Sequence, residues 1–205
     1  MGHSGTAIRL PRVLVADTGH DGTVPPPGVD AGILLRNTDL AALIDRALSG
    51  DPPPAVELDT IRGLGSDDAA VDFLRRRLSI SIMFTRRPQA ASAFAARGGL
   101  ALLNVMAFDS TGLRRSLHGH PRGERVGTVI SPGLVLHHML PSELALLVRP
   151  VVAYGLIDSA ADALATLAVA DGVVVRNAVA LGLAEAAALM RGAASQPRRN
   201  LSDAS

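Results

Sequence analysis

Two short segments, Val151-Val-Ala-Tyr-Gly-Leu-Ile157 and Asp171-Gly-Val-Val-Val-Arg-Asn177, decide the fold that we expect for this chain. Each contains a continuous apolar run, which is typical of a strand buried on both faces of a parallel sheet. Helical stretches follow at residues 159–168 and 178–190, with Ser159 and Asn177 as their expected N-caps. Two such units in succession place two helix N-termini side by side, where free backbone N–H groups favour a phosphate.

The same strand–helix alternation extends through the rest of the chain. Six further strands are expected at residues 12–17, 31–37, 55–59, 79–85, 100–108 and 127–131. Helices are expected at residues 39–48, 67–77 (capped by Ser66), 88–97, 110–117 and 134–148, the last with a break at Pro141. Residues 18–30 are the exception, because their three consecutive prolines and three glycines exclude a helix.

Eight strands in strict alternation with helices indicate right-handed crossovers and a closed barrel. We therefore expect an α/β fold, a small single-domain (β/α)8 TIM-type barrel over residues 11–193, in which a Pro/Gly loop replaces the helix after strand one. Residues 1–10 and 194–205 are expected to be a disordered N-terminus and a disordered tail. An open flavodoxin-like sheet has about five strands, which does not match this count.

The composition excludes several classes of protein. The chain has 205 residues and no cysteine, which excludes disulfides, thiolate metal sites and a cysteine nucleophile. It has no lysine, since all 20 basic residues are arginine, so lysine Schiff-base and P-loop chemistry are also excluded. No apolar run reaches the ~18 residues of a membrane span and no signal peptide is visible, so we expect a cytoplasmic protein without membrane contact. Asp17, His20 and Asp21 have side chains that can bind a metal, but they lie in a loop without a preset ligand geometry, so we expect no metal site and no resident cofactor.

Polar side chains follow most of the expected strands, where barrels of this kind place their chemistry. Asp59 follows the third strand, Arg86 the fourth and Arg176 the eighth. Arginine binds phosphate through a fork of donors, and a carboxylate accepts hydrogen bonds from polyol hydroxyls. Such residues also serve as simple helix caps, as we expect for Asp109. The pattern favours a pocket for a small phosphorylated polyol.

A series of motifs in matching order and spacing resembles one protein family. The series is Asp59-Thr-Ile-Arg-Gly-Leu64 with Asp67, Phe84-Thr-Arg86, Asn104-Val-Met-Ala-Phe-Asp-Ser110, Pro132-Gly133, Gly155-Leu-Ile157 and Asn177. It is similar to the glycerol-3-phosphate-responsive antiterminators over residues 33–181. The resemblance implies a small barrel protein that senses glycerol 3-phosphate and binds the leader messenger RNA of a glycerol-utilisation operon, so that transcription passes a terminator.

The resemblance also implies a ligand site. Its pocket wall would include Asp59 and the loop at Gly63, and main-chain donors near Asn177 would hold the phosphate. With the arginines at the strand ends, the expected ligand-binding residues are Asp59, Gly63, Arg86, Gly155, Leu156, Arg176 and Asn177. The chain departs from the family at Tyr154, where a glycine is usual, and at Asn104, which replaces an arginine.

Clustered arginines are the expected signature of RNA binding, because affinity for RNA rests on neutralising phosphates. Some candidates end the helices after strands three and four, at the end of the barrel opposite the ligand mouth, and others lie in the loop before strand six. They are Arg75, Arg76, Arg77, Arg97, Arg122 and Arg125. The alternative is that these cations only complement helix dipoles, each interaction contributing about 0.3–1 kcal/mol.

Three functions are compatible with the sequence. The first is a transcription antitermination regulator of glycerol metabolism, which is an RNA-binding protein and not an enzyme. The second is a TIM-barrel isomerase or lyase that acts on a small phosphorylated substrate, with Asp59 or Asp109 as the base. The third is a metabolite sensor without an RNA surface. The sequence leaves open whether the chain forms a homodimer.

Overall fold

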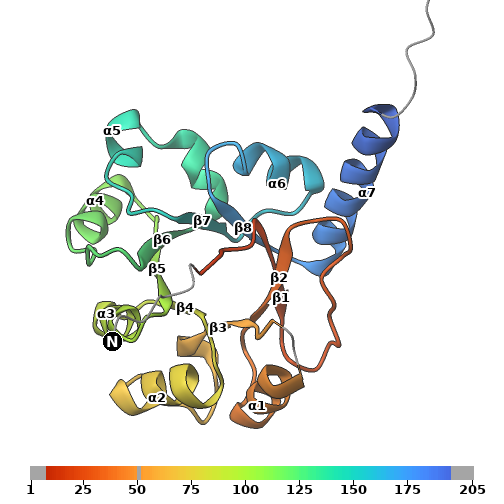
Figure 1. Ribbon diagram of the computed structural model, residues 1–205. Helices are drawn as coiled ribbons and strands as arrows, with labels where there is room; N and C mark the ends of the chain where they lie inside the picture. The colour runs from red at the N-terminus through yellow and green to blue at the C-terminus, as the bar shows by residue number, and fades with distance from the viewer. Residues whose placement is uncertain (1–7, 50–51, 195–205) are drawn as a thin grey trace, which may run out of the picture.

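Figure 1 shows the computed structural model of the chain, which describes residues 8–49 and 52–194. Eight parallel strands close into a barrel in sequence order, and β1 pairs with β8 to complete the ring. The strands are β1 (Val13–Asp17), β2 (Ala31–Leu35), β3 (Ala55–Glu57), β4 (Ile82–Thr85), β5 (Leu100–Met106), β6 (Val126–Ser131), β7 (Val151–Tyr154) and β8 (Gly172–Val175). The predicted α/β TIM-type barrel is therefore confirmed.

Helical segments follow every strand from β2 to β8 and surround the barrel. They are α1 (Leu40–Ser49), η1 (Leu58–Thr60), α2 (Asp68–Asp72), η2 (Phe73–Arg77), α3 (Pro88–Ala96), α4 (Ser110–His118), η3 (Gly133–His138), α5 (Pro141–Leu144), α6 (Ala160–Thr166) and α7 (Asn177–Ala194). Residues 18–30 contain no helix, as predicted. In Figure 1 this loop occupies the part of the ring between α1 and α7.

Two apolar clusters stabilise the barrel, one inside it and one between the strands and the helices. Alternate residues of each strand face the interior, where Leu34, Phe84 and Leu102 are almost completely buried. The residues between them, such as Leu35 and Met83, pack outward against the helices. Two positions beyond each interior residue, at the carboxyl ends of the strands, the inward series continues with Arg36, Glu57, Arg86, Asn104, Ser131, Tyr154 and Arg176. This end of the barrel is its mouth.

The structure confirms some predicted helix caps and corrects others. Asp109 and Ser159 cap their helices by accepting hydrogen bonds from Gly112 N (2.7 Å) and Asp162 N (3.0 Å). The cap of α2 is Asp67 and not Ser66, because the Asp67 carboxylate accepts from Ala70 N at 2.9 Å. Asn177 was also wrong as a cap. It is the first residue of α7, because the carbonyl of the residue before it accepts the first helical hydrogen bonds.

Several predicted boundaries shift for identifiable reasons. Strand β3 ends at Glu57, and the chain then makes a 3-10 turn that contains Asp59. The helix predicted at residues 134–148 is divided into η3 and α5, with the break before Pro141, where proline fits the first position of the second helix. At the N-terminal end, Ile8 and Leu10 pack against the cluster inside the barrel. Residues 1–7 and 195–205, most of the predicted disordered ends, lie outside the described residues.

Candidate functional site

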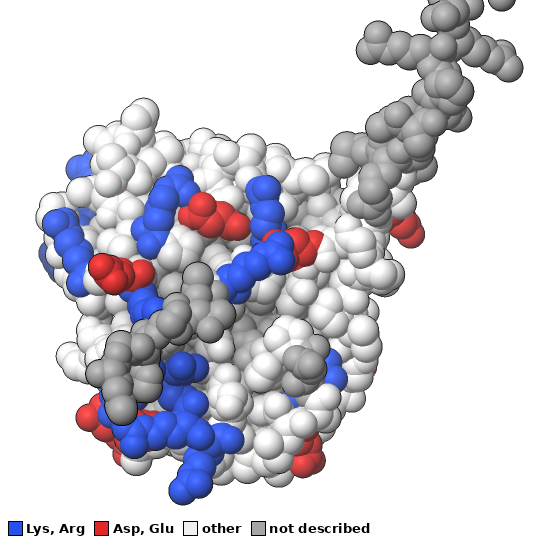
Figure 2. Space-filling view, viewed as in Figure 1, with Lys and Arg blue, Asp and Glu red and all other residues white. Residues whose placement is uncertain are grey.

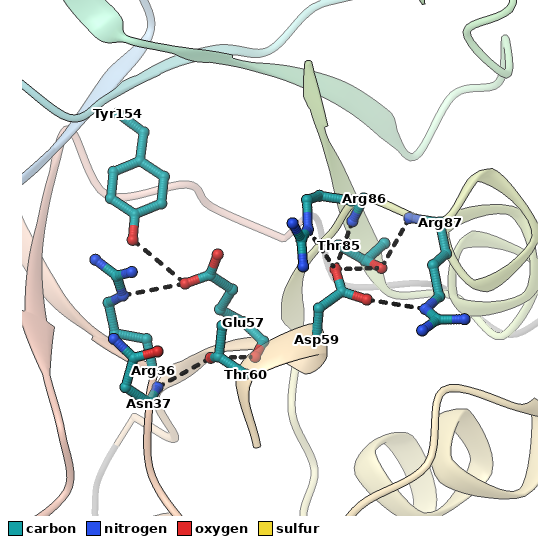
Figure 3. A network of polar contacts seen from close by, with 9 residues as sticks. All are labelled: Arg36, Asn37, Glu57, Asp59, Thr60, Thr85, Arg86, Arg87 and Tyr154. Carbon is teal, nitrogen blue, oxygen red and sulfur yellow. Dashed lines mark hydrogen bonds and ion pairs between the residues drawn. The ribbon is translucent and has the colours of Figure 1, made fainter. Parts of the chain in front are cut away.

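A buried ion pair lies on one side of the mouth. Glu57 is the last residue of β3, and Arg36 follows the end of β2. The Glu57 carboxylate forms a salt bridge with Arg36 Nε, at a distance of 3.1 Å. The hydroxyl of Tyr154, at the end of β7, donates to Glu57 Oε2 at 3.3 Å, and the Arg36 guanidinium lies 5.0 Å from the centre of the tyrosine ring. Figure 3 shows the three side chains converging from three strands. The triad links opposite walls of the barrel across its interior.

Burial determines the protonation of this triad. Burial raises the pKa of the Glu57 carboxyl, and the charge of Arg36 and the hydrogen bond from Tyr154 oppose this rise. The pKa of Tyr154 is raised by burial and by the negative charge of Glu57, so its hydroxyl stays protonated and can donate. The Tyr154 hydroxyl therefore has a defined partner in the Glu57 carboxylate.

A second cluster is organised by Asp59, on the 3-10 turn after β3. Its side chain is only 5% exposed, and it accepts hydrogen bonds from Thr85 Oγ1 (3.1 Å) and Arg86 N (2.6 Å). Its other oxygen accepts from Arg87 Nε at 3.2 Å (Figure 3). The carboxylate thus fixes the loop between β4 and α3. Protein donors thus contact both of its oxygens, and the predicted role of Asp59 as an acceptor for ligand hydroxyls stays a prediction.

The loop after β7 has an unusual backbone. Gly155 and Leu156 both adopt positive φ, 83° and 59°, and Leu156 is a non-glycine residue that is 62% exposed. Gly133 lies beneath this loop and donates its N–H to Gly155 O at 3.0 Å. A Cβ at Gly133 would lie 2.9 Å from Tyr154 N, so the Pro132-Gly133 motif has a physical reason: only glycine lets the two loops approach this closely.

The loops after β7 and β8 lie side by side. Tyr154 is the register partner of Val174, so Gly155 and Arg176 extend two neighbouring strands. The side chain of Arg176 joins the loops by pairing with Asp158 at 2.8 Å. Within residues 8–49 and 52–194, the N–H groups of Gly155 and Leu156 donate no hydrogen bond, and the N–H of Asn177, first in its helix, has no intrahelical acceptor. The predicted main-chain cradle is therefore open.

Two buried polar atoms face the same space without a partner. They are Asn104 Oδ1 on β5 and Ser131 Oγ at the end of β6, for which no hydrogen bond is found among the described residues. Both side chains belong to the inward-facing series, since they follow the interior residues Leu102 and Val129 by two positions. A buried oxygen without a hydrogen-bond partner is unfavourable unless a ligand or a water molecule donates a hydrogen bond to it.

The other predicted ligand residues are less central. Gly63 has a φ of 83° in a turn that packs against Leu40 at the start of α1, away from the inward-facing series. Arg86 points toward the mouth but lies 3.9 Å from the Asp59 carboxylate, and its side chain is 62% exposed. The predicted ligand-binding residues did not include Arg36 or Glu57. Their signal was the alternation itself, since each follows an inward-facing apolar residue by two positions.

The six arginines predicted to bind RNA all lie toward the opposite end of the barrel, but two of them are neutralised. Arg97 pairs with Asp72 at 2.5 Å and Asp68 at 3.6 Å, and Arg76 pairs with Asp72 at 3.6 Å. The other four have no carboxylate partner among the described residues; they are Arg75, Arg77, Arg122 and Arg125.

The described part of the chain offers no metal site, since no group of three or more His, Asp or Glu side chains is placed to hold an ion. Among the same residues no helix is both long and apolar enough to span a bilayer.

Comparisons with known proteins agree with this architecture. The family model of the glycerol-3-phosphate responsive antiterminators matches residues 31–178. A crystal structure of a glycerol uptake operon antiterminator-related protein from Thermotoga maritima is similar, with 20% identity, a TM-score of 0.67, and coverage of 84% of this chain and 99% of that one. The glycerol uptake operon antiterminator regulatory protein from Listeria monocytogenes gives 18% identity, a TM-score of 0.62, and coverage of 79% and 90%. A search of the curated proteins finds no match.

At these identities the two crystal structures support the barrel fold, while the family match spans most of the chain, including Asp59, Gly133, Gly155 and Asn177. The chain therefore belongs to the family of glycerol-3-phosphate-responsive antiterminators.

Proposed function

We propose that the chain binds glycerol 3-phosphate at the mouth of the barrel and, once loaded, binds the leader messenger RNA of a glycerol-utilisation operon to permit antitermination. The observation that carries the proposal is the open main-chain cradle formed by Gly155, Leu156 and Asn177. The family is one of regulators, which favours this function over an isomerase or lyase. The two candidate bases of such an enzyme, Asp59 and Asp109, are engaged in positioning a loop and capping a helix.

The cradle suits a phosphate for two reasons. Its donors are backbone N–H groups held in place by the positive φ angles of Gly155 and Leu156, so they require no rearrangement on binding. The N-terminus of α7 adds the partial positive charge of an 18-residue helix. The arginines of the mouth contribute less, because Arg36, Arg86 and Arg176 are already paired with carboxylates.

The glycerol part of the ligand has matching partners deeper in the mouth. Asn104 Oδ1 and Ser131 Oγ are two buried oxygens of the inward-facing series for which the described residues provide no partner, and polyol hydroxyls can donate to both. The side chain of Asn104 carries no charge, and its free atom is an acceptor oxygen, which suits a ligand hydroxyl and not a phosphate oxygen.

Calorimetric titration and thermal shift with glycerol 3-phosphate test the ligand half of the proposal, with glycerol and inorganic phosphate as weaker comparison ligands. At 100 times its dissociation constant the ligand should stabilise the protein by about 2.7 kcal/mol. Gly155→Ala should reduce this shift, since alanine disfavours a φ of 83° by about 1–2 kcal/mol and therefore disturbs the backbone that carries the donors. Gly98→Ala is the matched control. Its φ is 77°, its Cβ would also meet open space, and it lies at the far end of α3.

A gel shift of the leader RNA, with and without glycerol 3-phosphate at a fixed salt concentration, tests the RNA half. We place the RNA surface at the end of the barrel opposite the mouth, on Arg75, Arg77, Arg122 and Arg125. Arg76 and Arg97 take a smaller part because acidic side chains neutralise them. Absence of any ligand-dependent shift would contradict the proposal.

A further inference from the structure

A cavity of about 900 Å3 opens at the end of the barrel opposite the mouth. Its lining includes the first residues of several strands, such as Gly32 on β2, Ala55 on β3 and Ile82 on β4, which places it at the amino ends of the strands. Prolines of the loop before β2 and of the segment before β3 form one side of it. Its volume lies in the range of about 300–1,000 Å3 that is usual for small-molecule pockets.

The cavity has an apolar floor and a basic rim. Leu14 and Ile82, two members of the cluster inside the barrel, belong to the floor. Among the described residues that line it there is no aspartate or glutamate, whereas four are arginines: Arg9, Arg46, Arg75 and Arg125. Arg9 pairs with Asp30 at 3.0 Å, and the other three pair with no carboxylate among the described residues.

Backbone carbonyls hold these three arginines in place. Arg46 donates to Thr23 O at 2.5 Å, Arg75 to Ile80 O, and Arg125 to Gly98 O at 3.4 Å. A guanidinium has five N–H donors, so most of the donors of Arg46 and Arg125 are left over. Their charges also remain uncompensated, because a carbonyl is neutral.

The positive charges lie close enough to interact. Burial lowers the pKa of Arg75, and the charge of Arg125 lowers it further. Figure 2 views the molecule from this end and shows basic side chains gathered around the middle of the face. Like charges close to an apolar cavity repel one another, and a bound anion would offset this repulsion.

We propose that this cavity receives an unpaired nucleotide of the leader RNA, with its base against the apolar floor and its flanking phosphates on Arg46 and Arg125. The inference rests on the proposed RNA-binding function and adds the place and form of recognition. Proteins recognise RNA sequence mainly at unpaired bases, which pack on apolar or aromatic side chains and on arginine planes. Because aromatic residues make up only 2% of the chain, the base would pack on the apolar floor and on the guanidinium plane of Arg75.

Titration of a labelled single-stranded leader RNA, with glycerol 3-phosphate present and salt varied from 0.1 to 0.4 M, tests the basic rim. The double variant Arg46→Gln/Arg125→Gln should reduce the slope of log affinity against log salt by about 1.4. This value corresponds to the loss of two phosphate contacts, since each contact to a single strand contributes about 0.7. This corresponds to binding about 25-fold weaker at 0.1 M salt, if the contacts contribute nothing at 1 M. Arg115→Gln is the matched control, because Arg115 is exposed and unpaired among the described residues but lies outside the cavity.

A charge-neutral variant tests the floor. Ser81→Leu fills the cavity from its wall and offers no ring for stacking. In the wild type, removing the bound base by an abasic substitution should weaken binding by about 5- to 100-fold at one position of the leader. In Ser81→Leu the same abasic substitution should have little effect, and the double-mutant cycle isolates the contact. Unchanged melting temperatures establish that the variants are folded.

The outcomes separate this inference from the proposed function. If the wild type shows no ligand-dependent leader binding, both fail. If the wild type binds but the double arginine variant behaves like Arg115→Gln, or duplex RNA competes as well as single-stranded RNA, only the cavity assignment is overturned. Loss of antitermination in a transcription assay with unchanged RNA affinity would assign the cavity to an acidic protein partner and would also overturn it.

Discussion

At the mouth of the barrel the arginines are paired with carboxylates, whereas three arginines around the cavity at the other end donate to backbone carbonyls and pair with no carboxylate of the described residues. Arg36 pairs with Glu57, Arg87 with Asp59, and Arg176 with Asp158. Around the cavity, Arg46, Arg75 and Arg125 have carbonyl partners instead. The first arrangement gives a fixed and nearly neutral site, and the second keeps its positive charge available.

This difference predicts two ways of binding phosphate. A neutralised mouth has to hold an anion through its main-chain donors, whose geometry is fixed by Gly155 and Leu156. The opposite end attracts phosphates through the charges of arginine side chains, and that attraction is screened by salt. One end is suited to a small ligand of defined shape, and the other to a polyanion.

The largest effect is expected from Arg36→Ala, which removes one partner of the buried pair. Glu57 would keep only the hydrogen bond from Tyr154, and breaking a buried pair commonly destabilises by about 3–5 kcal/mol. The Arg36 side chain is 31% exposed, so we expect about 2–3 kcal/mol at pH 7, measured by denaturant unfolding. Arg176→Ala is the control. Its pair with Asp158 is exposed on both sides, and its loss should change stability by less than about 1 kcal/mol.

The same variant has a defined pH dependence. Because burial raises the pKa of Glu57 above its ordinary 4.5, the folded state binds this proton more tightly than the unfolded chain does. Protonation therefore favours the fold, and the cost of a charged Glu57 appears only as the pH rises through its raised pKa. The deficit of Arg36→Ala should be greatest at neutral pH and shrink as the pH falls toward 4.5. A deficit that stays constant over this range would show that Arg36 acts through packing alone.

Asp59→Asn should have the next largest effect. The amide keeps one acceptor, but its NH2 group faces either the Arg87 donor or the donors of the β4–α3 loop, so we expect a loss of about 1–3 kcal/mol. Affinity for glycerol 3-phosphate should fall only slightly, because Asp59 holds the loop and not the cradle. Unfolding and calorimetric titration measure the two quantities separately. A large loss of affinity in a normally stable variant would mean that Asp59 contacts the ligand.

Salt should separate the two ends directly. If three phosphates are bound at the basic end, raising salt from 0.1 to 0.3 M should weaken binding of single-stranded leader RNA by about tenfold. Affinity for glycerol 3-phosphate should change much less, because neutralised arginines and fixed N–H groups carry its site. Parallel titrations at the two salt concentrations measure both. Equal salt dependence would mean that charged side chains also dominate at the mouth.

The sequence was sufficient for the fold because the barrel depends on repeated local signals. Apolar strands, glycine and proline breaks and caps such as Ser159 recur along the chain, and each can be read without tertiary information. The errors concerned helix caps, where neighbouring residues are equally suitable by residue type. Asp67 and Ser66 are both good caps, and only the helix start decides between them. Asn177 was assigned as a cap from its residue type, although the carbonyl of Arg176 begins the helix.

The site was predicted less completely, since its partners are brought together from distant strands. Glu57 and Tyr154 are 97 positions apart, and nothing in either segment identifies the other as its partner. Asp59 was predicted as a ligand-binding residue because it is polar and lies near a strand end. The acidic residue that faces the interior is Glu57, two residues earlier. Likewise Arg97 is an obvious basic candidate in the sequence, and only the structure places Asp72 against it. Which charges are free is a tertiary property.

The smallest effect, and the sharpest test of the main-chain cradle, is expected from Leu156→Gly. Leucine at a φ of 59° is strained, and glycine removes this strain but adds entropy to the unfolded chain, so stability should change by less than about 1 kcal/mol. If the donors are backbone N–H groups, affinity for glycerol 3-phosphate should stay within about twofold, measured by calorimetry. The Leu156 side chain is 62% exposed and has no polar atom to offer a phosphate. A tenfold loss would therefore mean that the loop closes over the ligand through this side chain, and the contrast between a main-chain site and a side-chain site would no longer hold.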